Sequence, residues 1–436
     1  MNQTSAVVRA VRLLILPLTA VALVPVLLTE LHFFSIHDLV GATIPDTIFF
    51  GHAAQGLMQG HLPYGPHFVV APDRRVVFVY PPLSLLLAVP PLLAGAEYSF
   101  GFAVELVVLL VAGLWLLGSA CRRMGISFPV VLTSALLLVA LGPVVVTRVD
   151  GLQGLALAGA ALALRSRRMA LAVALVTLAA LVKETVVVAA LPVVVWALWP
   201  SEGEKWTEGL GRRASRVGLG LVPAVLVLLT FEVWSKGNVL AAAAASIHRG
   251  VEVESVPATI SYLLHPIFGA TTYIGKLASV QVSGPQVPLV AAVVAVVGGV
   301  ALVWGAVHFA RRRRRPASAI AFAIAVTLAT TPVLSPQYLL ALMPVLVLAA
   351  GTEFTRPRAT LLLASGLVLA LLTQVEFPYL FASVAALHPV GTAVVAARNL
   401  LLIALAINLV RAAPGPVAEP NAERVRPPVA SGIHFG

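Results

Sequence analysis

The chain has 436 residues, of which 59% are hydrophobic and only 11% are charged. Ordinary soluble domains carry about 25% charged residues, so the composition excludes such a domain and indicates a polytopic membrane protein. The formal net charge of +11 has two readings, nucleic-acid binding or membrane topology, and the positions of the basic residues decide between them.

Apolar runs of roughly 17–25 residues are candidate transmembrane helices. Several runs here are shorter, which suits helices that end below a water-filled cavity, where irregular backbone is tolerated. We therefore expect an all-α fold with about twelve transmembrane helices, and a re-entrant or interfacial helix at 82–95. The predicted spans cover residues 13–29, 101–119, 128–146, 151–164, 169–182, 184–199, 217–234, 287–309, 317–332, 336–351, 358–373 and 392–411.

The charged residues sort to opposite sides of this arrangement. Of the 29 Lys and Arg, 21 fall on connections or termini that it places in the cytoplasm, including the run Arg311–Arg315, and 12 of the 18 acids fall at or near the outer face. Basic residues accumulate on the cytoplasmic loops of membrane proteins. The positive charge thus indicates topology and not nucleic-acid binding, and it predicts that both termini are cytoplasmic.

The domain organisation follows from the same pattern. We expect one integral-membrane domain over residues 1–411, with a first external loop at 30–100 and a second long external loop at 235–286. The Pro- and Ala-rich stretch 412–436 is predicted to be a disordered cytoplasmic tail. A plasma-membrane protein of this organisation would carry its chemistry in the external loops.

Polar and ionisable residues gather in those outer segments, most densely between Glu30 and Tyr80. Ionisable residues at membrane depth are costly and tend to be functional. Lys183 separates two apolar segments of half the usual length, so its burial would require an anionic partner. The alternatives are a phosphate of a ligand, an ion pair with the neighbouring Glu184, or an interfacial lysine that snorkels to water.

The second outer loop carries the sequence from His248 to Ser255. Arg249 and His248 are candidates for recognising a phosphate or a sugar, because a guanidinium binds oxyanions through two hydrogen bonds. Glu252 and Glu254 are two residues apart, so only one of them need face a cavity if the backbone is extended. An internal Arg–Glu ion pair is the alternative. Further candidate cavity or acceptor contacts are Tyr64, Tyr80, Asp150, Gln337 and Tyr338.

Two segments of the first loop, DTIFFGHAAQGLMQGHLPYG from Asp46 and VYPPLSLLLAVP from Val79, resemble the first-loop signature of family 87 glycosyltransferases. These are polyprenyl-phosphate-mannose-dependent enzymes of actinobacteria, in the C superfamily of integral-membrane glycosyltransferases. The resemblance runs from about residue 38 to about residue 405. It continues in Arg148 with Asp150, Lys183, RGVEVES at 249–255, SPQY at 335–338, TQVEFP at 373–378 and Arg398-Asn399.

The resemblance implies a role for Asp46. Polyprenyl phosphate is a good leaving group, so the reaction needs a base for the acceptor hydroxyl and cations or donors for the phosphate, but not the paired acids of a glycosidase. Similarity to the family makes Asp46 that base in an inverting transfer, and it places Lys183, Arg249, His248 and Arg148 as donor-binding candidates. The alternative is that Asp46 only caps a loop helix.

This sequence departs from the family pattern at two positions. The family often has Tyr where this chain has Phe50, and its actinobacterial branch often has Glu where this chain has Val79. Both departures bear on contacts with the sugar and the acceptor, and neither touches Asp46.

The function implied is that of a hexosyltransferase, which moves mannose from a polyprenyl phosphate to a hydroxyl of a cell-envelope glycolipid or glycan on the extracytoplasmic face. An arabinofuranosyltransferase that uses polyprenyl-phosphate arabinose is the alternative within this class. A lipid or sugar transporter is the alternative outside it, but it would place charges near the midplane of two repeated halves, whereas this chain has one-sided charges. The sequence specifies no cofactor and leaves a divalent cation, Mg²⁺ or Mn²⁺, open.

The charge pattern makes a prediction about sidedness. In a Cys121→Ser background, which removes the single cysteine, a Gln59→Cys variant should react with a membrane-impermeant maleimide in intact cells. A Ser166→Cys variant, on a connection predicted to be cytoplasmic, should react only after permeabilisation. The reverse pattern of labelling would contradict the predicted topology.

Overall fold

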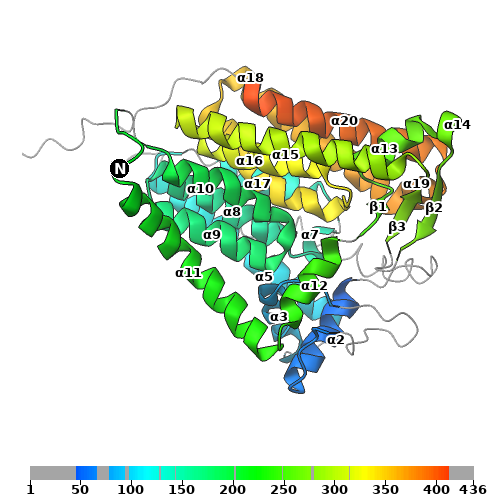
Figure 1. The fold of residues 1–436 in the computed structure, drawn as a ribbon, viewed down its shortest axis with the longest axis horizontal. Helices are drawn as coiled ribbons and strands as arrows, with labels where there is room; N and C mark the ends of the chain where they lie inside the picture. The colour runs from blue at the N-terminus through cyan, green and yellow to red at the C-terminus, as the bar shows by residue number, and fades with distance from the viewer. Residues whose placement is uncertain are drawn as a thin grey trace, which may run out of the picture.

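The structure is a computed structural model that describes residues 46–65, 78–93, 98–126, 129–142, 144–200, 203–247, 249–275, 279–313 and 315–411. The predicted span at 13–29, His248 and the predicted tail at 412–436 lie outside the described residues. Helices dominate, and a small sheet lies at one edge of the molecule beside α13, α14 and α19 (Figure 1).

The described helices follow the chain in this order: α2 (Asp46–Met58), α3 (Pro82–Leu87), α4 (Pro90–Leu93), α5 (Tyr98–Arg123), α6 (Pro129–Val139), α7 (Val144–Thr147), α8 (Asp150–Arg165), α9 (Met169–Val182), η1 (Glu184–Ala189), α10 (Ala190–Leu198), α11 (Leu210–Trp234), α12 (Asn238–Ile247), α13 (Val256–Leu263), α14 (His265–Phe268), α15 (Val287–Arg312), α16 (Pro316–Thr330), η2 (Pro336–Tyr338), α17 (Leu339–Glu353), α18 (Arg356–Gln374), η3 (Val375–Leu380), α19 (Phe381–Ala385) and α20 (Pro389–Arg411).

Every predicted span that falls on described residues coincides with a helix or a pair of short helices. Among the described residues, six helical segments are long and apolar enough to cross a membrane: Tyr98–Arg123, Leu210–Trp234, Val287–Arg312, Pro336–Glu353, Arg356–Ala385 and Pro389–Arg411. The protein is therefore a multi-pass membrane protein, but the predicted number of about twelve spans is not confirmed. The described part of 82–95 forms the short helices α3 and α4, neither of which could cross a bilayer.

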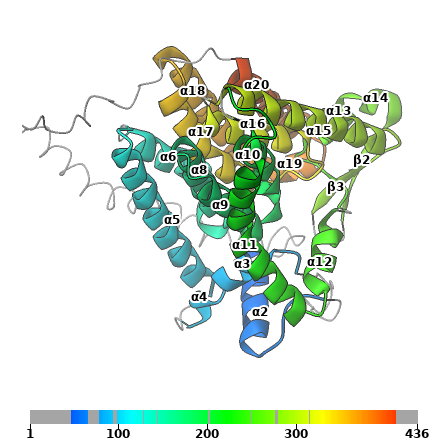
Figure 2. The ribbon, with the colours of Figure 1, turned by 60° about the vertical axis from the view of Figure 1, so that its left-hand side comes forward.

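The helices pack as a bundle centred on α8 and α17. α15, α16, α17, α18 and α20 lie side by side, α8, α9 and α10 form the adjoining part, and α11 lies on α9 (Figure 1). Small residues allow the closest approaches. A Cβ atom at Gly154 of α8 would lie 2.5 Å from the carbonyl oxygen of Leu340 in α17, and one at Gly220 of α11 would lie 2.5 Å from that of Ala170 in α9. Figure 2 shows α5 and α11 leading from this bundle towards α2, α3 and α4.

The all-α prediction is wrong for the second long loop. Strands β1 (Val251–Glu252), β2 (Thr271–Ile274) and β3 (Val280–Ser283) form an antiparallel sheet in the order β1-β3-β2. The strands are too short to show a clear alternation of polar and apolar residues, but they are rich in the β-branched and aromatic residues that strands favour. This pairing holds the segment that carries Arg249 and Glu252.

The basic connections meet at the end of the bundle that lies away from the sheet. Arg313, just after α15, donates to the carbonyl of Trp199 at the end of α10, and Arg315 donates to the carbonyl of Leu409 in α20 at 2.7 Å. Glu353 accepts hydrogen bonds of 2.8 Å from the first amides of α16, which the end of that helix would otherwise leave without partners. These residues, which the charge pattern assigned to one side of the membrane, thus lie together at one end of the bundle. Which side that is remains a prediction.

Candidate active site

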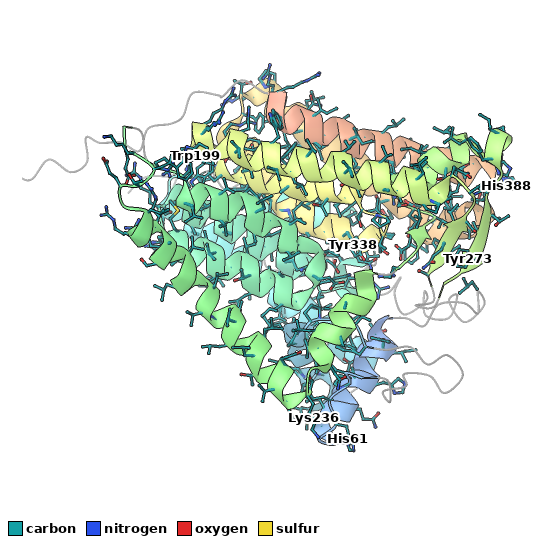
Figure 3. All side chains as sticks on the ribbon, in the orientation of Figure 1. His61, Trp199, Lys236, Tyr273, Tyr338 and His388 are labelled. Carbon is teal, nitrogen blue, oxygen red and sulfur yellow. The ribbon has the colours of Figure 1, made fainter. Side chains whose placement is uncertain are left out.

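A group of buried polar residues lies towards the middle of the molecule, at the end of the bundle that faces α12 and the sheet. Figure 3 places Tyr338 there, far from Trp199 at the basic end. We call this group the central cluster. It consists of Tyr80, Asp150, Lys183, Glu184, Arg249, Glu252 and Tyr338.

Lys183 lies at a break between two helices. Its backbone is extended (φ −158°, ψ 134°), which ends α9 before η1 begins. The side-chain amide of Gln153 donates to the carbonyls of Ala179 at 2.8 Å and Lys183 at 2.7 Å, and so satisfies acceptors that the end of α9 leaves open. Gln153 of α8 therefore stabilises the break between α9 and η1 through these two hydrogen bonds.

The ammonium of Lys183 is buried and paired. The residue is only 3% exposed, and its Nζ donates to Oδ2 of Asp150, a fully buried residue at the start of α8, at 3.1 Å. Its partner is thus neither the neighbouring Glu184 nor interfacial water, the two alternatives to a ligand phosphate that the sequence left open. A lysine in apolar surroundings requires such a partner, because an uncompensated buried charge is strongly destabilising.

Two aromatic rings complete the surroundings of this ammonium. Nζ of Lys183 lies 4.5 Å from the ring centroid of Tyr338 and 5.6 Å from that of Tyr80, within the range of cation–π attraction. The hydrogen bond to Asp150 uses one of the three protons that an ammonium carries. The arrangement holds the charge in place while leaving donor capacity for a ligand.

Tyr80 connects the cluster to the first loop. Its carbonyl accepts a hydrogen bond of 3.0 Å from the hydroxyl of Tyr64, and its ring packs 4.7 Å from the ring of Phe50 in α2. Tyr64 and Phe50 are both buried in an aromatic core beneath α2. Phe50, one of the two departures from the family pattern, therefore supports Tyr80 by packing, and Tyr64 uses its hydroxyl within the protein.

Arg249 and Glu252 form the second ion pair of the cluster. Nη2 of Arg249 donates to Oε1 of Glu252 at 2.7 Å, so the internal pair that the sequence analysis left open is present. Burial lowers the pKa of Arg249, but the carboxylate of Glu252 raises it, and the net shift is upwards, so the guanidinium stays charged. The amide of Glu252 donates to the carbonyl of Pro332 at 2.9 Å, which joins β1 to the segment before η2.

The structure brings together some of the predicted site residues and not others. Arg148 is half-buried two residues before Asp150, and Gln337 is half-buried next to Tyr338. Asp46 is the first residue of α2, but its side chain lies outside the described part of the structure, as does all of His248. The role of Asp46 as base or cap thus stays a prediction. Glu184 is a member of the cluster that the sequence analysis considered only as an ion-pair partner.

Glu254 lies in a separate buried network. Arg398 of α20 donates to the carboxylate of Glu376 and to the backbone carbonyl of Glu254. Asn399 donates to the same carbonyl at 3.1 Å and to the hydroxyl of Thr259 at 2.8 Å. Glu252 and Glu254 thus have different partners, although the backbone turns after β1 and is not extended as far as Glu254. The network ties the strand that carries Glu252 to the last helices.

Among the described residues, no group of three or more His, Cys, Asp or Glu could hold a metal ion. The central cluster contains a buried cation, Lys183, and a half-buried one, Arg249.

The Arg398 network makes a prediction about stability. Arg398→Met would leave the fully buried Glu376 without its cation, and breaking a buried pair in this way costs about 3–5 kcal/mol. The midpoint of thermal unfolding of the purified protein in detergent should fall clearly. Arg358→Met, which removes an exposed arginine from α18, is the matched control and should change the midpoint little. An equal midpoint for both variants would contradict the structural role of Arg398.

The chain was compared with known proteins. The search of curated proteins finds no match. Among solved structures, the crystal structure of ArnT from Cupriavidus metallidurans bound to undecaprenyl phosphate is similar, with a TM-score of 0.43 and 15% sequence identity over 85% of this chain and 72% of that one. The family model for glycosyltransferase family 87 matches residues 78–336. That match covers more than half of the chain and all the charged residues of the central cluster, and it shows that the protein belongs to glycosyltransferase family 87.

Proposed function

We propose that this membrane glycosyltransferase moves mannose from a polyprenyl phosphate to a hydroxyl of a cell-envelope glycolipid or glycan, on the extracytoplasmic face of the plasma membrane. The observation that carries the proposal is the pair of cations, buried Lys183 and half-buried Arg249, in one cluster at the end of an apolar bundle. A lipid-linked phosphate is the anion that would meet such a cluster from the membrane.

The two cations suit the phosphate of the donor. Lys183 keeps protons for a ligand beyond its bond to Asp150. Nε of Arg249 is buried and, among the described residues, has no hydrogen-bond partner. Negative charge grows on the phosphate as the bond to the sugar breaks, and donors fixed in advance stabilise that charge more than they stabilise the bound ground state.

The charge balance of the cluster allows an anion to enter. The carboxylates of Asp150 and Glu252 pair with the two cations, while Glu184 adds a third carboxyl group and Arg148, two residues before Asp150, adds a third positive charge. Burial raises the pKa of Glu252, although Arg249 opposes that shift.

Asp46 is the proposed general base. It lies four residues before Phe50, one helical turn away, so both positions share a face of α2. The ring of Phe50 packs on Tyr80, whose ring in turn flanks Lys183. The base would take the proton of the acceptor hydroxyl as its oxygen bonds to the anomeric carbon, and polyprenyl phosphate would leave from the opposite face with the bonding electrons.

The direct test is a transfer assay with labelled polyprenyl-phosphate mannose and an envelope lipid extract, followed by identification of the product. Polyprenyl-phosphate arabinose, supplied in parallel, distinguishes the two donor sugars. Transfer of mannose to an extractable lipid or glycan supports the proposal. Absence of transfer from either donor by the folded protein would overturn it.

The proposed base predicts a large and specific loss of activity. Asp46→Asn keeps the shape of the side chain but removes its proton affinity, so transfer should fall by about 10²–10⁴-fold. Glu208→Gln, which neutralises an exposed carboxylate outside the cluster, should be close to the unaltered protein. Near-normal transfer by Asp46→Asn would move the base elsewhere, with Asp150 and Glu252 as the next candidates.

If Lys183 and Arg249 hold the donor phosphate, replacing either of them should lower the transfer activity. A hydrogen bond to a charged group contributes about 1.5–3 kcal/mol, so Lys183→Met and Arg249→Met should each lower transfer by about 10–200-fold. Because Lys183→Met leaves Asp150 buried and charged, the double variant with Asp150→Asn controls for unfolding. Normal donor use by the double variant and by Arg249→Met would place the phosphate elsewhere.

A further inference from the structure

Glu184 carries a carboxyl group of the central cluster that forms no ion pair with any described residue. It follows Lys183 at the break before η1, yet the ammonium of Lys183 pairs with Asp150. Oε2 of Glu184 is buried and, within the described residues, has no hydrogen-bond partner. A buried acceptor left in this state costs about 1–3 kcal/mol, so a ligand that donates to it would recover that cost.

The surroundings of Glu184 indicate which ligand this is. The carboxyl group of Glu184 interacts electrostatically with Lys183, Arg249 and Asp150. It also interacts in this way with the hydroxyl group of Tyr338. Within the described residues, the same cluster therefore offers unused donors, Nε of Arg249 and the remaining protons of Lys183, and an unused acceptor, Oε2 of Glu184. A ligand that satisfies both must carry an anionic oxygen and a hydroxyl group close to each other.

A sugar joined to a phosphate has this combination. Its phosphate oxygens accept from Arg249 and Lys183, and its ring hydroxyls can donate to a carboxylate a few bonds away. Phosphate without a sugar would leave Oε2 of Glu184 unsatisfied. The polyprenyl chain has no hydrogen-bond donor, so it cannot satisfy this oxygen either.

We propose that Glu184 accepts a hydrogen bond from a hydroxyl group of the donor sugar, and so distinguishes the sugar-charged lipid from the spent polyprenyl phosphate. This inference rests on the proposed function, because it requires the donor phosphate to lie on Lys183 and Arg249. A site built to bind a hydroxyl group rejects analogues that lack it, since its own buried polar group is then left without a partner. The same preference would favour release of the product phosphate once the sugar has been transferred.

The test compares two ligands on the purified full-length protein: undecaprenyl-phosphate mannose and undecaprenyl phosphate. Glu184→Met removes the acceptor at similar volume, and it should weaken binding of the sugar-charged lipid by about 10–200-fold. Its affinity for undecaprenyl phosphate should stay within about twofold. Glu184→Gln, which keeps a neutral acceptor, should show a smaller loss of the same kind and guards against misfolding of the Met variant.

Deoxy-mannose donors identify the hydroxyl group. The analogue that lacks the group bound by Glu184 should bind the unaltered protein weakly and show no further loss with Glu184→Met, whereas the other analogues should still lose affinity. An equal loss for both undecaprenyl ligands would overturn the inference, because Glu184 would then support the phosphate or the fold. If Lys183→Met binds undecaprenyl phosphate as well as the unaltered protein does, the proposed function itself fails, and the inference fails with it.

Discussion

A lysine inside an apolar bundle must find a negative partner, and the burial of Lys183 against Asp150 shapes the centre of this protein. Lys183 is only 3% exposed; α9 ends at Val182, and the extended backbone at Lys183 accompanies the contact of its side chain with α8. Gln153 of α8 supports the same break by binding two carbonyl groups of it. Irregular backbone at such a depth is tolerated only where protein or a water-filled cavity surrounds it.

The two ends of the bundle are stabilised in different ways. At the basic end, arginines donate to backbone carbonyls at helix ends and Glu353 accepts from the first amides of α16. At the other end, paired charges join segments that lie far apart in the chain, as Arg398 does with Glu376 and the carbonyl of Glu254. The hydrogen bonds at the basic end join the ends of neighbouring helices. The ion-pair network at the other end holds the segment after β1, the strand that carries Glu252.

The cluster combines tightly paired charges with two unused buried groups. Arg249 and Lys183 are held by carboxylates, so they are oriented before any ligand arrives. Such preorganisation reduces the reorganisation that a reaction would otherwise require. Nε of Arg249 and Oε2 of Glu184, for which the described residues offer no partner, mark the places where a ligand would complete the network.

The sequence by itself determined the membrane class, the positions of the helices and the need of a buried Lys183 for an anionic partner, because long apolar runs and an isolated charge between them are local signals. It could not determine how many of the helices are long enough to cross the membrane, since short helices on either side of a break resemble one continuous apolar run. Only the tertiary structure decided that Asp150, 33 residues away, neutralises Lys183, that Glu252 and Glu254 serve different networks, and that Glu184 is left with an unused oxygen. These outcomes depend on which segments meet in space, and an ion pair between residues as far apart in the chain as Asp150 and Lys183 leaves no trace in their spacing.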